Sequence, residues 1–292
     1  MSKHIFLIPS FPKSGNTLMR MIISSLFFTK DGVIDLKNIR VDQLENVDNL
    51  NLIKEINQND FYKLDDLSIL YKYHLKIKEK KNLHFSEDFA FFKTHHSLIN
   101  YNKFEYINQK FLRGYIYLIR DPRDIAISWA NHVNTSISES IEFVLNEKSC
   151  INWARNKKSL FPINIKPLLL TSSWENHVLS WTKNTLSVPK LIISYEDLIT
   201  SKEKIVLKII DFFRANFCLE PENVDIKIKN ILKTSDFNFL SAVEEKYGFE
   251  ERAEGKFFNK GIKNQWKEVL TNDQVKKIEN KFFVTMKKFN YI

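Results

Sequence analysis

Cysteine and glycine are scarce in this chain of 292 residues, which has 2 Cys and 6 Gly. Cys150 and Cys218 have neither a second Cys nor a His at ligand spacing, so the sequence predicts no zinc site and no disulfide framework. The low glycine content excludes collagen-like repeats, and a hydrophobic fraction of 43% excludes a disordered chain. A chain of this length buries a full core without metal or disulfide support. We therefore expect one domain, residues 1–292, in a reducing compartment.

Long hydrophobic runs are absent as well. The first apolar run, 5–8, ends at Pro9, and the next, 21–28, is interrupted by Ser24 and Ser25. Both are too short for a signal peptide or a membrane span. The sequence therefore predicts a soluble, cytoplasmic protein.

Arginine contributes only 8 of the 44 basic residues, and the net charge is +9. Proteins that recognise nucleic-acid sequences rely on Arg for bidentate contacts to bases, so we expect no specific nucleic-acid partner. A positive balance also raises the local concentration of small anions around a cleft. The charge therefore favours a small polyanionic ligand.

Short apolar runs alternate with segments of helical spacing. This alternation predicts an α/β fold of three layers, in which helices flank a central parallel sheet. Ligands bind such sheets beyond the carboxyl ends of the strands. The segment 36–88 predicts short helices with polar linkers, and 134–170 predicts irregular structure. The expected strands are 5–8, 89–92, 115–119 and 191–194, and the expected helices begin near residues 16, 122, 172 and 202.

The loop after the first expected strand contains Lys13, Ser14 and Gly15, directly before a helix. Free backbone N–H groups, the positive end of a helix and a cation together form a cradle for an anion. The P-loop pattern Gly-x4-Gly-Lys-Ser/Thr is absent, because the lysine precedes the glycine. An ordinary helix start is the alternative interpretation.

Arg120 follows the third expected strand, and Ser128 lies eight residues later, two turns into the next helix. An Arg at a strand end binds phosphate in bidentate fashion. The alternative is a surface ion pair with Asp121 or Asp124. We expect these two carboxylates to serve the start of the helix.

Lys93 and His95 follow the second expected strand at a spacing of two residues, which places both side chains on one side of an extended chain. A histidine can take a proton from an attacking hydroxyl, and a nearby lysine can stabilise developing negative charge. His96 points the other way and is expected to be structural.

Taken in order, these motifs resemble the cytosolic-type sulfotransferases, which use 3'-phosphoadenosine 5'-phosphosulfate (PAPS) as donor. The resemblance covers about residues 6–271 and implies a P-loop-like sulfotransferase fold. It rests on Pro12-Lys13-Ser14-Gly15-Asn16-Thr17, Lys93-Thr94-His95, Arg120 with Ser128, the helix around Trp174-x-x-His177-Val178-Leu179-x-Trp181, Tyr195-Glu196-Asp197-Leu198, and Asn259-Lys260-Gly261 followed by Trp266-Lys267.

The resemblance implies a role for each matched catalytic residue. The loop 13–17 would hold the 5'-phosphate and sulfate, and Lys13 would stabilise the bridging oxygen as the sulfuryl group departs. His95 would be the general base, with Lys93 near the transferring group. Arg120 and Ser128 would bind the 3'-phosphate, and Ser128 would also restrain Lys13 until the acceptor is present. No metal is implied.

The remaining donor contacts depart from the family pattern at three positions. Asn16 replaces the first Thr of the loop, and Leu18 replaces an aromatic residue that stacks on adenine. Asn259 replaces an Arg of the late loop, residues 259–261, which the resemblance places over the 3'-phosphate. These changes predict either a lower donor affinity or a different position of the nucleotide. The resemblance implies that the full donor set comprises Lys13, Ser14, Gly15, Asn16, Thr17, Leu18, Arg120, Ser128, Tyr195, Ser235, Phe237, Asn259, Lys260 and Gly261.

The sequence leaves the acceptor and the oligomeric state open. The acceptor could be a small molecule, a glycan or a lipid, and the segments 36–88 and 134–170 would cover its site. The dimer motif of the family matches Lys267 and Thr271 but not Asn272 and Lys276, so a homodimer is neither predicted nor excluded. The alternative functions are a phosphoryl transferase of the P-loop class and a non-catalytic binder of nucleotides or polyanions.

Overall fold

The structure is a computed structural model of the 292-residue chain. It describes residues 4–37, 39–44, 89–98, 100–101, 104–107, 109, 112–152, 168–183, 186–249, 251, 257–258 and 261–292. Most of the segment 36–88, the middle of 134–170, and the predicted donor residues Asn259 and Lys260 lie outside the described residues.

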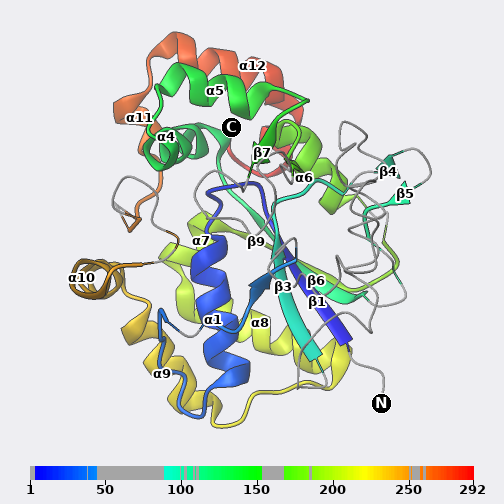
Figure 1. The fold of residues 1–292 in the computed structure, drawn as a ribbon, viewed down its shortest axis with the longest axis vertical. Coiled ribbons are helices and arrows are strands. Elements are labelled where there is room, and N and C mark those ends of the chain that lie inside the picture. The colour runs from blue at the N-terminus through cyan, green and yellow to red at the C-terminus, as the bar shows by residue number, and fades with distance from the viewer. Residues whose placement is uncertain are drawn as a thin grey trace, which may run out of the picture.

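A five-stranded parallel sheet forms the centre of the molecule, with the strand order β2-β3-β1-β6-β9 (Figure 1). All four predicted strands are present, and each is somewhat longer than the apolar run that indicated it. The predicted α/β fold is therefore confirmed. The strands are β1 (His4–Pro9), β2 (Asp42–Gln43), β3 (Phe89–Thr94), β6 (Leu112–Ile119) and β9 (Lys190–Ser194).

The sheet is buried on both faces, which explains why its strands are apolar at nearly every position. Side chains alternate between the faces along a strand. In β1, Phe6 and Ile8 pack in one core, and Ile5 and Leu7 pack in another. The two cores make the molecule a three-layer structure.

One core joins the sheet to α1, α8 and α9. Met19, Ile22, Ile23 and Leu26 of α1 pack in this core at helical spacing. The helix itself was predicted from Leu18, Met21, Ile22, Ser25 and Leu26. The bounds are α1 (Asn16–Phe28), α8 (Lys202–Phe217) and α9 (Val224–Thr234).

The other core joins the sheet to helices α4, α5, α6 and α12, which gather at one end of the molecule (Figure 1). The prediction of irregular structure over 134–170 is wrong for the part that forms α5, and for 150–152 and 168–170, which pair as two short antiparallel strands. Ser136 and Glu139 form a capping box at α5, and this pair is a sequence signal for the start of a helix. The bounds are α4 (Pro122–Val133), α5 (Ile137–Leu145), α6 (Trp174–Thr182) and α12 (Asn272–Lys288).

The smaller elements connect these layers. The segment that resembled a dimer motif forms the short helix α11 and the start of α12, where Thr271 caps the helix through the backbone N–H of Gln274. The remaining bounds are β4 (Asn100–Tyr101), β5 (Phe104–Glu105), β7 (Cys150–Asn152), β8 (Leu168–Leu170), α7 (Tyr195–Thr200), α10 (Phe237–Tyr247) and α11 (Trp266–Val269).

The strands end in register. Pro9 pairs with Thr94, Ser10 forms a bridge with Leu118, and Ile119 pairs with Ser194. Since the strands are parallel and adjacent, the loops after β1, β3, β6 and β9 all leave from the same edge of the sheet, which we call the carboxyl edge. This arrangement brings Lys13, His95, Arg120 and Tyr195 to one place, as the sequence predicted.

Candidate functional site at the carboxyl edge

The loop between β1 and α1 makes a tight turn before the helix. Lys13 and Gly15 have positive φ values of 66° and 90°, so the chain folds back before the helix starts. Gly15 occupies the N-cap position, and no side chain caps the first turn of α1. A Cβ atom at Gly15 would lie 2.6 Å from the ring of Tyr195, so only glycine lets the loop and α7 pack this closely.

The amino group of Lys13 is poorly solvated. Burial, and then the charge of Arg120, lower the pKa of Lys13 to about 8. Its Nζ atom lies 4.6 Å from the ring centroid of Phe257, which lies near the late loop. A bound anion would relieve the repulsion between Lys13 and Arg120.

Arg120 is buried and faces the loop. Its Nη1 donates to the backbone oxygen of Lys13 at 2.9 Å, and its guanidinium lies 4.1 Å from the ring centroid of Tyr195. The Nε atom has no hydrogen-bond partner among the described residues. A surface ion pair is therefore the wrong interpretation of this arginine, because Asp121 pairs with Arg123 at 2.6 Å.

The two aspartates after Arg120 have different roles. Asp121 caps α4 as predicted, since it accepts the backbone N–H of Arg123. Asp124 instead accepts the backbone N–H groups of Asn264 and Trp266 at 2.7 and 3.0 Å. It therefore ties the segment after the late loop to α4, a function that the prediction of helix capping missed.

His95 is held in one orientation. Its Nδ1 lies 2.8 Å from the backbone oxygen of Ser10 and 3.2 Å from the Ser10 hydroxyl. A carbonyl oxygen can only accept, so Nδ1 carries the proton and Nε2 is left as a proton acceptor. Burial, and then the charge of Lys93, lower the pKa of His95 to about 3, which keeps the ring neutral at physiological pH.

Asn16 supports this orientation. Its Nδ2 donates to the Ser10 hydroxyl at 3.0 Å and to the backbone oxygen of Ile8 at 2.8 Å. Asn16, predicted as a donor contact, thus ties the start of α1 to the end of β1 and holds the residue that orients His95. Its Oδ1 is buried without a described partner.

Thr17, Arg20 and Lys93 converge on one carboxylate, that of Glu251. Thr17 donates to Oε2 at 2.7 Å, Lys93 lies 3.1 Å from Oε1, and Arg20 also contacts Oε1. Thr17 and Lys93 were predicted from the sequence, whereas Arg20 and Glu251 were not. Arg20 is a charged residue within an apolar helical segment, which is the signal that could have identified it.

The other predicted residues surround this centre. Ser14 is buried, and its hydroxyl has no described partner. Leu18 packs against the core of α1, α8 and α9 and against a smaller cluster that contains Met21 and Phe258. Ser128 is half-buried on α4. His96 is buried against Tyr106 with ring centroids 4.0 Å apart, which agrees with the structural role predicted for it.

The late segment approaches α10. A Cβ atom at Gly261, where φ is 62°, would lie 2.2 Å from the ring of Phe237. The Ser235 hydroxyl and the Trp266 Nε1 are buried without described partners. The approach of Gly261 to Phe237 brings the described end of the late loop beside one of the predicted donor residues.

The described residues contain neither a membrane span nor a metal cluster. None of the described helices is long and apolar enough to cross a membrane. No group of three or more His, Cys, Asp or Glu side chains in the described ranges could hold a metal ion.

Comparison with solved structures shows the same fold in two proteins. One is mouse sulfotransferase SULT7A1 complexed with PAP, with a TM-score of 0.59, 18% identity, and coverage of 97% of this chain and 84% of that chain. The other is retinol dehydratase in complex with androsterone and inactive cofactor PAP, with a TM-score of 0.59, 18% identity, and coverage of 98% and 82%.

The structural similarities show the fold, and the comparison of sequences identifies the family. No curated protein matches the chain. Residues 3–290, however, match the sulfotransferase domain family. Because this match spans nearly the whole chain, the protein belongs to the sulfotransferase family of enzymes.

Proposed function

We propose that this protein transfers a sulfuryl group from PAPS to a hydroxyl or amine of an acceptor. The observation that carries the proposal is the convergence of Lys13, His95 and Arg120 at the carboxyl edge, from three loops that are far apart in the sequence. Family membership supports the reaction class, and the geometry is consistent with the roles that the resemblance implies.

The residues at the carboxyl edge fit a donor that carries several phosphate and sulfate oxygens. Ser14, Arg120 and Ser235 each have a buried polar atom without a described protein partner. Buried polar groups are normally paired, so such atoms together indicate a ligand that pairs them. We propose that loop 13–17 holds the 5'-phosphate and sulfate, that Arg120 and Ser128 hold the 3'-phosphate, and that Tyr195, Ser235 and Phe237 contact the adenine.

Gly261 is proposed to take part in the late loop over the 3'-phosphate. Asn259 and Lys260, the other members predicted for that loop, lie outside the described residues. Leu18, at the position of an aromatic residue in related enzymes, packs into the core, so Phe237 is proposed as the stacking partner of the adenine.

His95 is proposed as the general base. Its Nε2 takes the proton of the acceptor hydroxyl while the acceptor oxygen forms a bond to sulfur. When bound, PAPS supplies an activated sulfuryl group, whose bond to the 5'-phosphate oxygen breaks in the same step. The hydrogen bond from Nδ1 to Ser10 keeps the unprotonated Nε2 available for this step.

Lys13 is proposed to stabilise the oxygen left on the 5'-phosphate, and Lys93 to stabilise charge on the transferring group. Both are poorly solvated, which strengthens their interaction with a developing charge. Charge stabilisation by lysines and backbone N–H groups can replace a metal clamp, because a sulfuryl group carries less charge than a phosphoryl group.

The acceptor proposed here is a small molecule with a free hydroxyl. This choice rests on retinol dehydratase, whose structure contains androsterone and, in a second crystal, retinol. Glycans and larger lipids are the alternatives. A transfer screen with labelled sulfate across phenols, alcohols, amines, glycans and lipids identifies the class, and the absence of transfer to every class would contradict the proposal.

The alternative function is phosphoryl transfer by a P-loop enzyme. It requires a lysine after the glycine of the loop, whereas Lys13 precedes Gly15. Calorimetry with ATP and magnesium against the bisphosphate nucleotide PAP separates the two functions, and PAP is expected to bind more tightly. A variant with His95→Ala separates the enzyme from a non-catalytic binder, because only an enzyme has activity to lose.

A further inference from the structure

Glu251 is bound by the protein as an anionic ligand would be. Both of its carboxylate oxygens are engaged, Oε2 by the Thr17 hydroxyl and Oε1 by Arg20 and by Lys93. Burial alone would raise the pKa of Glu251, but Lys93 and Arg20 outweigh burial and hold the pKa well below the usual range. The carboxylate is therefore ionised and pairs with two cations.

The three residues that hold Glu251 lie in α1 and β3, whose backbones do not depend on this carboxylate. Arg20 also donates from Nε and Nη2 to the backbone oxygen of Val41, at 2.9 and 2.6 Å. Thr17 lies in the first turn of α1, and Lys93 lies in β3, directly before the carboxyl edge. Removal of the carboxylate would thus leave an intact cluster of two cations and a hydroxyl.

Glu251 is the exposed member of the cluster. Its side chain is 27% exposed, against 8% for Arg20 and 9% for Lys93. The cluster is also close to the proposed base, since the charge of Lys93 contributes to the depressed pKa of His95. An anion that reaches His95 therefore meets the partners of Glu251.

We propose that Thr17, Arg20 and Lys93 form an oxyanion subsite that Glu251 fills in the ligand-free protein, and that the sulfuryl end of the donor must replace this carboxylate. The subsite is inferred from the contacts of Glu251 alone. Only the identity of the replacing group rests on the proposed function. One set of donors cannot serve two anions, so Glu251 weakens donor binding and does so less for PAP, which lacks the sulfuryl group.

The first experiment tests the subsite with inorganic sulfate. Glu251→Gln removes the charge that Arg20 and Lys93 share, so its melting temperature should fall by about 4 °C or more. Sodium sulfate should restore most of this loss relative to sodium chloride at equal ionic strength, a larger gain than in the wild-type protein, which gains only from the site around Arg120 and Ser14 and from the general effect of sulfate on proteins. A variant that responds to sulfate no more than the wild type would overturn the proposal.

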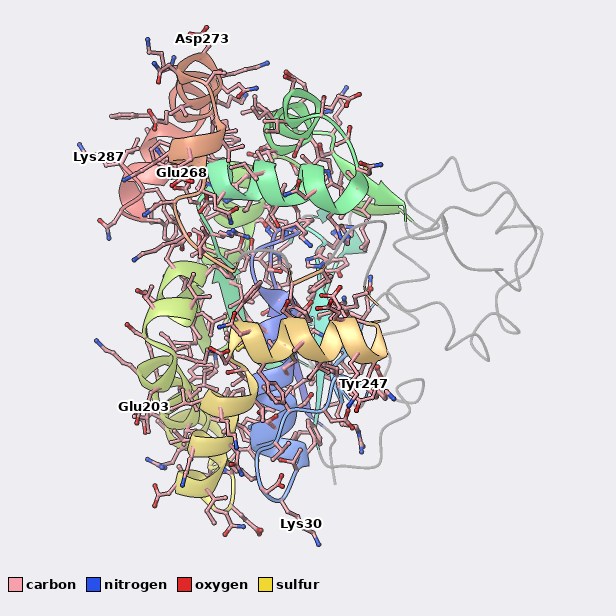
Figure 2. The ribbon with its side chains drawn as sticks, turned by 90° about the vertical axis from the view of Figure 1, so that its left-hand side faces the viewer. Lys30, Glu203, Tyr247, Glu268, Asp273 and Lys287 are labelled. Carbon is pink, nitrogen blue, oxygen red and sulfur yellow. The ribbon has the colours of Figure 1, made fainter. Side chains whose placement is uncertain are left out.

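Glu268→Gln is the matched control for the change in net charge. Glu268 is exposed on α11, and Figure 2 shows it with Asp273 and Lys287 at the end of the molecule formed by α11 and α12. Its melting temperature should respond to sulfate as the wild type does. Glu251→Ala is a second variant, because a glutamine side chain can still fill part of the subsite, and it should show the same restoration by sulfate.

The second experiment measures the dissociation constants of PAPS and PAP by calorimetry without acceptor. Glu251→Gln should bind PAPS about 10-fold more tightly than the wild type, the size of one charge-assisted interaction, and PAP less than about 3-fold more tightly. Equal affinities of both proteins for PAPS would overturn the proposed replacement. If sulfate restores the variant but neither nucleotide binds either protein, the subsite stands and the proposed function fails.

Discussion

The carboxyl edge has two halves that satisfy their polar groups in different ways. On the Lys93 side, Thr17, Arg20 and Lys93 all contact Glu251. On the Arg120 side, the Ser14 hydroxyl and Arg120 Nε are buried without described partners. One half of the site is thus neutralised by the protein, and the other half keeps buried polar atoms that the described residues do not pair.

This difference has an energetic consequence. A buried donor without a partner costs about 1–3 kcal/mol, so the Arg120 side lowers the stability of the free protein. An anion that binds there removes this cost and displaces no protein group. An anion on the Lys93 side gains less, because it replaces an existing ion pair. We therefore expect the nucleotide to derive most of its affinity from the Arg120 side.

The largest expected effect concerns catalysis rather than affinity. His95→Ala should lower kcat by about 10²- to 10⁴-fold, because the acceptor proton then has no positioned base. The affinity for PAP should hardly change, since His95 contacts neither half of the proposed nucleotide site. Transfer of labelled sulfate and calorimetry with PAP measure the two quantities.

Imidazole in solution provides the control for this variant. It can enter the space left by the side chain and act as the missing base, so it should restore part of the activity of His95→Ala. A variant with wild-type turnover would contradict the assignment of the base. Partial recovery with imidazole would show that the loss is chemical and not a folding defect.

The second prediction tests the Arg120 side directly. Arg120→Ala should weaken PAP binding by about 10- to 100-fold, the size of a lost charge-assisted contact, with adenosine 5'-phosphosulfate hardly affected. The latter compound lacks the 3'-phosphate that Arg120 is proposed to bind. Calorimetry with both ligands provides the test. Equal weakening of both would mean that Arg120 supports the loop of Lys13, whose backbone oxygen it contacts, rather than the 3'-phosphate.

Much of the fold follows from local sequence. The four apolar runs correspond to β1, β3, β6 and β9, because a strand buried on both faces must be apolar almost throughout. The helix α5 was not predicted, although its capping box is visible in the sequence, because it follows another helix rather than an apolar strand. The helix α12 was not predicted because its mean hydropathy is low, although its buried residues Ile278, Phe282, Thr285 and Met286 recur at helical spacing.

The site was predictable only in part, and the missing part has a physical reason. Lys13, His95 and Arg120 each follow a strand, and parallel strands bring their ends together without further information. Glu251 follows no strand, and its contact with Thr17 spans 234 residues of sequence. A tertiary ion pair of this kind has no local pattern. The orientation of His95 by Ser10 was missed for the same reason.

The third prediction concerns the late segment that approaches the Arg120 side. Gly261→Ala should weaken PAP binding by a few-fold and lower the free energy of unfolding by about 1–3 kcal/mol, because its Cβ would meet the ring of Phe237 at 2.2 Å. Gly248→Ala is the matched control, since Gly248 also has a positive φ, 74°, but nothing lies within 4 Å of its Cβ position. Urea denaturation and calorimetry should therefore show a larger effect for Gly261→Ala than for Gly248→Ala.

The smallest expected effect is the uptake of a fraction of a proton when PAP binds. It distinguishes the two halves of the site, because Lys13 can take up a proton near pH 8 and Glu251 cannot. Lys13 has a pKa of about 8 in the free protein, because of burial and the charge of Arg120, so at pH 8 about half of the molecules carry the proton. A bound bisphosphate favours the charged form, so PAP binding should take up about half a proton at pH 8 and should weaken as the pH rises above 8. Glu251 contributes no uptake, because it is already ionised and its pKa is far below this range. Calorimetry in two buffers of different ionisation enthalpy measures the uptake. Lys13→Arg should abolish it, since an arginine stays charged, and uptake that persists in this variant would assign the proton to another group.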